Sequence, residues 1–149
     1  MYFCDEEEID ELRSWGEVAF VLEDQWTEVR DRATGLQVAR DDRSVLVYEP
    51  EMATAKQRRL LHRAGFRKWQ PQSWSWTPPD PDPADLKPLP YEPTLPWMRA
   101  RWEAFRMRAQ RDRALAAMAL RVARDLMGSA PEDLTVLVFV EGEDWDEVG

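Results

Sequence analysis

The chain has 149 residues, of which 44% are hydrophobic and 33% are charged, and its formal net charge is −9. This length and composition predict one folded domain and exclude a largely disordered chain. They also argue against general nucleic-acid binding, because affinity for phosphates depends on unopposed cationic surface.

The single cysteine and the first residues of the chain indicate in which cellular compartment the protein is expected. Cys4 has no partner for an intrachain disulfide, and nothing suggests an oxidising environment. The opening MYFCDEEEIDEL is acidic where a signal peptide is basic and then apolar, and no apolar run approaches the roughly 18 residues that span a membrane. Arginine outnumbers lysine 17 to 3, which is typical of a GC-rich bacterial genome. We therefore expect a bacterial cytoplasmic protein without a membrane partner.

Charge is unevenly distributed along the chain. Residues 1–31 carry eleven acidic and two basic side chains, and residues 129–149 carry seven acidic and no basic ones. The middle, residues 32–128, is therefore net basic by seven charges. Two interpretations are open: the opposite blocks attract each other within the fold, or they present a polarity to a partner.

The first predicted element is a helix over residues 5–22. Its apolar residues, such as Ile9 and Leu12, are spaced by three and four, and acidic residues occupy its first turn. Gly16 weakens this prediction, because it could end the helix and leave VAFVL as a short strand.

A β-meander and a second helix follow. Turn-forming residues divide residues 26–49 into β-rich segments that predict an antiparallel hairpin or meander. Residues 54–64 predict a helix with Thr54 as its N-cap and Gly65 as its C-cap.

A proline-rich segment separates these elements from the rest of the chain. Nine of the eleven prolines lie between Pro71 and Pro96, so residues 77–96 predict a stiff extended crossover within the domain. Just before it, Ser73–Trp76 place two tryptophans on one side of an extended segment. Either both enter the core as the fourth strand of a sheet, or both line a groove.

The last part predicts a long helix and a strand. Two apolar stripes within residues 97–127 are offset, which indicates a bend near 111–113 or two separate helices, closed by Gly128. Residues 134–140, LTVLVFV, predict a central strand, and residues 141–149 an acidic, frayed tail. The order α-β-β-α-(β)-crossover-α-β predicts an α+β fold, with a twisted antiparallel sheet packed by helices.

No set of residues indicates catalysis. His62 lies among arginines without an identifiable serine or cysteine partner, and one histidine with one cysteine makes no zinc site. The acidic runs lack the spacing of a calcium loop, and no glycine-rich loop could cradle a phosphate. We therefore expect a non-catalytic protein with no cofactor and no metal site.

Binding features are richer. Residues 97–113 combine arginine with tryptophan, which is the composition of interface anchors, although a solvated helix face paired with the acidic termini is the alternative. The candidate partner-binding residues are Trp74, Trp76, Trp97, Arg101, Trp102, Phe105 and Arg108. An alternative acidic site comprises Glu141, Glu143, Asp144 and Trp145.

Part of the chain resembles a known family. The helix pattern T-x-x-Q-x-x-x-L-x-x-x-G-F (Thr54, Gln57, Leu61, Gly65, Phe66) precedes a strand with proline and tryptophan, and residues 121–139 lead from a helix through a proline turn into a strand. Together they resemble the YbjN and type III secretion chaperone-like (TY-Chap) domains of actinobacteria. The resemblance implies non-catalytic peptide or protein binding, often among like domains.

The sequence therefore predicts a protein- or peptide-binding chaperone or adaptor, with homodimer formation left open. The alternative is an acidic inhibitor or immunity protein that neutralises a basic partner through residues 141–149.

Overall fold

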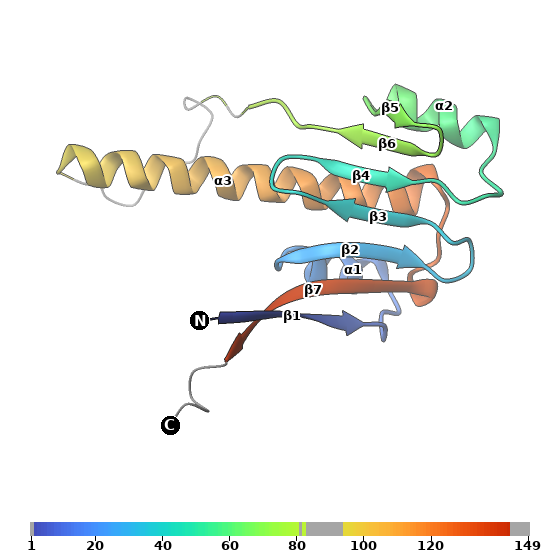
Figure 1. Cartoon of the computed structure of the whole chain (residues 1–149), viewed down its shortest axis with the longest axis horizontal. Helices are drawn as coiled ribbons and strands as arrows, with labels where there is room; N and C mark the ends of the chain where they lie inside the picture. The colour runs from blue at the N-terminus through green and yellow to red at the C-terminus, as the bar shows by residue number, and fades with distance from the viewer. Residues whose placement is uncertain (1, 81, 83–93, 144–149) are drawn as a thin grey trace.

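The computed structural model describes residues 2–80, 82 and 94–143, and it places seven strands in one antiparallel sheet (Figure 1). The elements in chain order are β1 (Tyr2–Ile9), α1 (Trp15–Leu22), β2 (Trp26–Asp31), β3 (Gln37–Arg40), β4 (Val45–Tyr48), α2 (Ala55–Arg63), β5 (Arg67–Gln70), β6 (Ser73–Trp76), α3 (Pro96–Arg121), the π-helical turn η2 (Val122–Leu126), the 3₁₀ turn η3 (Pro131–Asp133) and β7 (Leu134–Glu143). The strand order is β1-β7-β2-β3-β4-β6-β5. The predicted α+β fold is confirmed.

The middle of the chain folds as its local sequence predicts. Strands β2, β3 and β4 form the meander, and β6 joins it by pairing with β4. Helix α2 begins with a capping box, in which Thr54 Oγ1 accepts from the Gln57 amide and Gln57 Oε1 accepts from the Thr54 amide. The chain leaves α2 through Gly65, whose φ of +103° lies in the region that favours glycine.

The N-terminal prediction is wrong in its first half. The predicted helix over residues 5–22 is a strand, β1, and a separate helix, α1, that begins only at Trp15 behind the N-cap Ser14. Strand β1 pairs with β7 at eight successive positions, so long-range backbone hydrogen bonds override the local helical spacing. The edge strand β5 was not predicted at all.

Helix α3 is continuous where a bend or a break was expected. It runs from Pro96 to Arg121 without interruption at residues 111–113, widens into η2, and ends at Gly128, whose φ is +69°. The offset between the two apolar stripes has another cause, because only the second stripe packs on the sheet.

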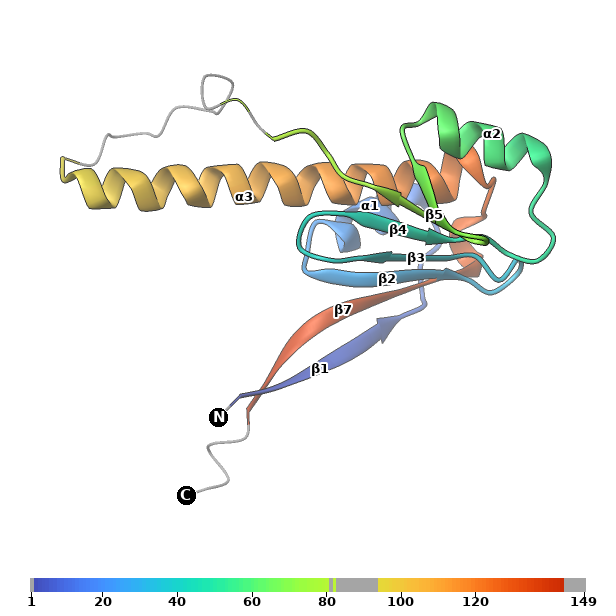
Figure 2. The ribbon, with the colours of Figure 1, turned by 45° about the horizontal axis from the view of Figure 1, so that its top comes forward.

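All three helices lie on one face of the sheet (Figure 2). Their buried side chains meet the core-facing residues of the strands, and the cluster includes Trp26, Val29, Val38, Val45, Val47, Leu61, Leu115, Val122 and Val136. Strand β7 lies inside the sheet between β1 and β2, and its residues 134–138 are buried, as its apolar run predicted. Within the described ranges, no helix combines the length and apolarity needed to cross a membrane.

Candidate partner-binding surface

Only the second half of α3 packs on the sheet. Its buried residues, Leu115, Ala116, Met118 and Ala119, all lie in its last seven positions. The first half extends past the ends of β2, β3 and β4 (Figures 1 and 2). We call this projecting part, residues 96–111, the α3 stalk.

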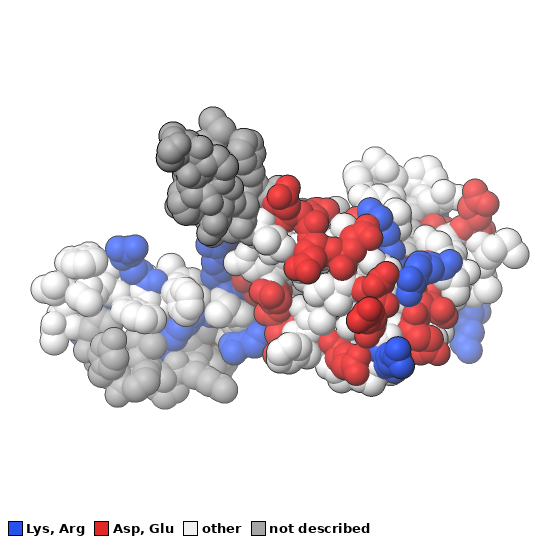
Figure 3. All heavy atoms as spheres, turned by 90° about the horizontal axis from the view of Figure 1, so that it is seen from below, with Lys and Arg blue, Asp and Glu red and all other residues white. Residues whose placement is uncertain are grey.

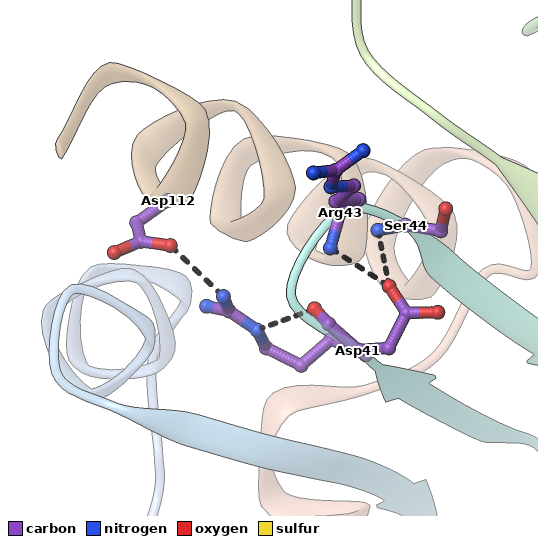
Figure 4. A network of polar contacts seen from close by, with 5 residues as sticks. Asp41, Arg43, Ser44 and Asp112 are labelled. Carbon is purple, nitrogen blue, oxygen red and sulfur yellow. Dashed lines mark hydrogen bonds and ion pairs between the residues drawn. The ribbon is translucent and has the colours of Figure 1, made fainter. Parts of the chain in front are cut away.

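An ion pair fixes the point at which the stalk leaves the sheet. Arg40, the last residue of β3, donates from Nη2 to Asp112 Oδ1 at 2.9 Å (Figure 4). The same guanidinium lies 5.7 Å from the ring centroid of the buried Trp26, which adds a cation–π contact. The arginine therefore ties α3 to the core side of the sheet just where the stalk begins.

The turn that follows Arg40 is held by Asp41. Its Oδ1 accepts from the backbone amides of Arg43 and Ser44 at 2.8 and 2.7 Å, and its carbonyl accepts from Arg40 Nε at 3.3 Å (Figure 4). A turn closed in this way restricts the position of Arg40, so the direction of the stalk is built into the β3–β4 connection.

Helix geometry shows which side of the stalk continues the core-facing side of α3. An α-helix has about 3.6 residues per turn, so positions eighteen apart point in the same direction. Trp97 therefore points as Leu115 does, and Arg101 as Ala119 does. Both Leu115 and Ala119 are fully buried in the core. The core-facing side of α3 thus continues along the stalk, which extends beyond the ends of the strands.

This side of the stalk carries exposed aromatic and arginine side chains. Trp97 is 58% exposed and Phe105 is 62% exposed. Arg101 lies between them and Arg108 one turn after Phe105, and both arginines are exposed. Trp102 is half-buried and packs edge-to-face on Phe105, with ring centroids 5.9 Å apart. The structure thus brings together five of the seven candidate residues. We call Trp97, Arg101, Phe105 and Arg108 the stalk stripe.

The stalk is basic. Among residues 96–111, five arginines face a single acidic residue, Glu103. Seen from the β1 side, Asp and Glu cover much of the body of the molecule with Lys and Arg among them, while the charged side chains in view at the end where α3 projects are Lys and Arg (Figure 3). In the part of the chain that the structure describes, the side chains of Arg101 and Arg108 make no hydrogen bond or ion pair.

Other arginines are neutralised by adjacent carboxylates. Hydrogen bonding from Arg124 lowers the pKa of the Asp125 carboxyl and raises the pKa of the guanidinium itself. A hydrogen bond to Glu28 likewise raises the pKa of Arg30. The charges of the stalk stripe differ from these in having no such neighbour among the described residues, so they remain available to an outside carboxylate.

Trp74 and Trp76 do not join the stalk surface. They lie on the core-facing side of β6, opposite Val47 and Val45 of β4. Trp74 is only 7% exposed, and its Nε1 donates to Glu49 Oε2 at 2.8 Å; Trp76 is half-buried and packs against the core. Of the two readings of this strand, the structure selects the core, and the groove interpretation is wrong.

The acidic tail begins later than predicted. Glu141 and Glu143 belong to β7, with their Cα atoms opposite those of Cys4 and Tyr2 in β1. Backbone pairing with β1 therefore extends the strand beyond Val140. Asp144 and Trp145, like most of the predicted crossover, lie outside the described residues.

Comparisons with known proteins do not identify a family for this chain. No protein-family model, curated protein or solved structure matches the chain. Within the described ranges, no three or more His, Cys, Asp or Glu side chains are grouped to hold a metal ion. The resemblance to the YbjN and TY-Chap domains stays a prediction.

Proposed function

We propose that the protein is a non-catalytic chaperone or adaptor that holds an acidic segment of another protein against the stalk stripe. The observation that supports this most strongly is the alignment of Trp97 and Phe105 with the side of α3 that is buried farther along. A peptide-binding role is also what the resemblance to the TY-Chap domains implies.

The aromatic residues would supply the buried area. Farther along α3, Leu115 and Ala119 are fully buried in the core; on the stalk, the partner would supply this cover. Tryptophan and arginine are the residues most enriched among binding hot spots. Because the stalk is a continuous helix held at Asp112, its stripe is already ordered, which lowers the conformational entropy lost on binding.

The arginines specify the chemistry of the partner. Guanidinium groups form strong, often bidentate hydrogen bonds with carboxylates. Arg101 and Arg108 are seven residues apart, which is about 10 Å along the helix axis. An extended peptide covers this distance in about three residues. We therefore expect two acidic residues about three positions apart, with an apolar side chain between them to contact Phe105.

A random peptide library displayed on phage tests this function. Selection is carried out on the full chain alone, and the retained peptides are afterwards compared on the wild type and on the Trp97→Ser/Phe105→Ser variant. We expect the retained peptides to combine paired acidic residues with an apolar one. Selected peptides that are predominantly basic, or that bind the wild type and the variant equally, would contradict the proposal.

A further inference from the structure

The two edges of the sheet carry opposite charge. Among the described residues the sheet begins at β1 and ends at β5, so each of these strands has one neighbouring strand there. Residues 5–12, which include most of β1, contain six acidic and no basic side chains. Residues 52–79, which span α2, β5 and β6, contain six basic and no acidic ones. One end of the sheet is therefore strongly negative and the other strongly positive.

The acidic edge presents carboxylates in every direction. Four successive residues of β1, from Asp5 to Glu8, are acidic, and all four are exposed. Successive side chains of a strand point to opposite faces, so both faces of this edge carry negative charge. Its backbone pairs with β7 on the inner side, and the sheet order leaves the outer side open.

The basic edge is short and fully exposed. All four residues of β5 are exposed. Arg67 and Lys68 are successive residues of this edge strand, so their side chains point to opposite faces of the sheet. The Lys68 amino group lies 5.8 Å from the Trp74 ring centroid, which holds it at the edge. Arg59 and Arg63 of the adjacent α2 are also exposed and add to the positive charge.

We propose that a second copy of this chain docks its β1 edge against the β5 edge, so that the sheet continues from one molecule into the next. Charged edges normally keep sheets apart, and here they exclude the like pairings, β1 with β1 and β5 with β5. The unlike pairing instead places opposite charges across the strands, which is favourable. Four successive acidic positions provide a carboxylate to Arg67 and Lys68 in several registers.

This contact is head-to-tail, so it uses different surfaces on the two molecules. Such a contact leaves one free edge of each kind and adds further copies unless the rotation closes a ring. We expect the mean mass in solution to rise with protein concentration at low ionic strength. Because exposed charges are screened by salt, the mass should fall to the monomer value of 17.5 kDa near 0.5 M NaCl.

Two neutralised variants test the geometry. The first, Glu6→Gln/Glu7→Gln/Glu8→Gln, keeps only the basic edge; the second, Arg67→Gln/Lys68→Gln, keeps only the acidic edge. By sedimentation equilibrium, we expect each variant alone to be monomeric. An equal mixture should form a one-to-one pair that cannot grow, and in that pair amide hydrogen exchange of residues 67–70 should slow in the first variant only.

A matched control separates this contact from partner binding by the stalk. The Arg101→Gln/Arg108→Gln variant removes the same number of positive charges as the β5 variant and should associate as the wild type does. The inference is overturned if the wild type stays monomeric at low salt, if either edge variant associates as strongly as the wild type, or if the mixture remains monomeric. None of these outcomes bears on the peptide selected by the stalk.

Discussion

Replacing Trp74 with alanine is expected to lower the free energy of unfolding by about 3–5 kcal/mol, the usual range for removing a large buried aromatic side chain. The indole is only 7% exposed, and its Nε1 is a hydrogen-bond donor to Glu49. The Glu49 side chain is 3% exposed, and in the variant Arg58, which donates to its other oxygen at 3.1 Å, would be its remaining side-chain donor. Urea denaturation followed by circular dichroism measures the loss.

Trp69 provides the control for this substitution. It lies on the edge strand β5 and is 49% exposed, so Trp69→Ala should change the free energy of unfolding by less than about 1 kcal/mol. Trp74→Phe keeps most of the volume and removes the donor, so it should fall between the two. If Trp74→Ala is no more damaging than Trp69→Ala, Trp74 is not a core residue and would return to the list of surface candidates.

The second large effect concerns binding. Changing both Trp97 and Phe105 to serine should weaken the affinity for the selected acidic peptides by at least about 30-fold, which corresponds to about 2 kcal/mol and is typical of hot-spot aromatics. The free energy of unfolding should change little, because both side chains are largely exposed. Isothermal titration calorimetry measures the affinity.

Phe20→Ser is the matched control for these two substitutions. Phe20 is 74% exposed and belongs to α1, whereas the stalk stripe belongs to α3. Its replacement should leave the peptide affinity unchanged. A comparable loss of affinity in the Phe20 variant would show that general hydrophobicity, and not the stalk stripe, holds the peptide.

The fold could be predicted where the signals are local. The capping box of Thr54 and Gln57 and the turns of the meander depend on neighbouring residues alone, and they formed as expected. Strand β1 could not be predicted in this way, because its sequence YFCDEEEI becomes a strand through pairing with β7, more than 120 residues away. Trp74 was ambiguous for a related reason, since alternation along a strand does not say which face is covered.

The candidate surface could be predicted in its composition but not in its position. The arginine and aromatic residues of the stalk stripe stood out in the sequence, whereas their alignment with the core-facing side of α3 depends on where the sheet ends. The ion pair between Arg40 and Asp112 joins residues 72 positions apart, and no periodic pattern marks either of them. Sequence spacing identifies a helix face, but only the fold shows which part of that face lies uncovered.

The central claim, that the stalk stripe contacts a protein partner, is tested most directly by photo-cross-linking in the native host. A benzophenone-bearing phenylalanine analogue replaces Phe105 in one strain and Phe20 in another, and irradiated cells are examined for covalent adducts. We predict a discrete adduct from position 105 that is absent from position 20 and is lost when Arg101 and Arg108 are changed to glutamate. Adducts from position 20 alone, or an adduct from position 105 that survives this charge reversal, would contradict the account.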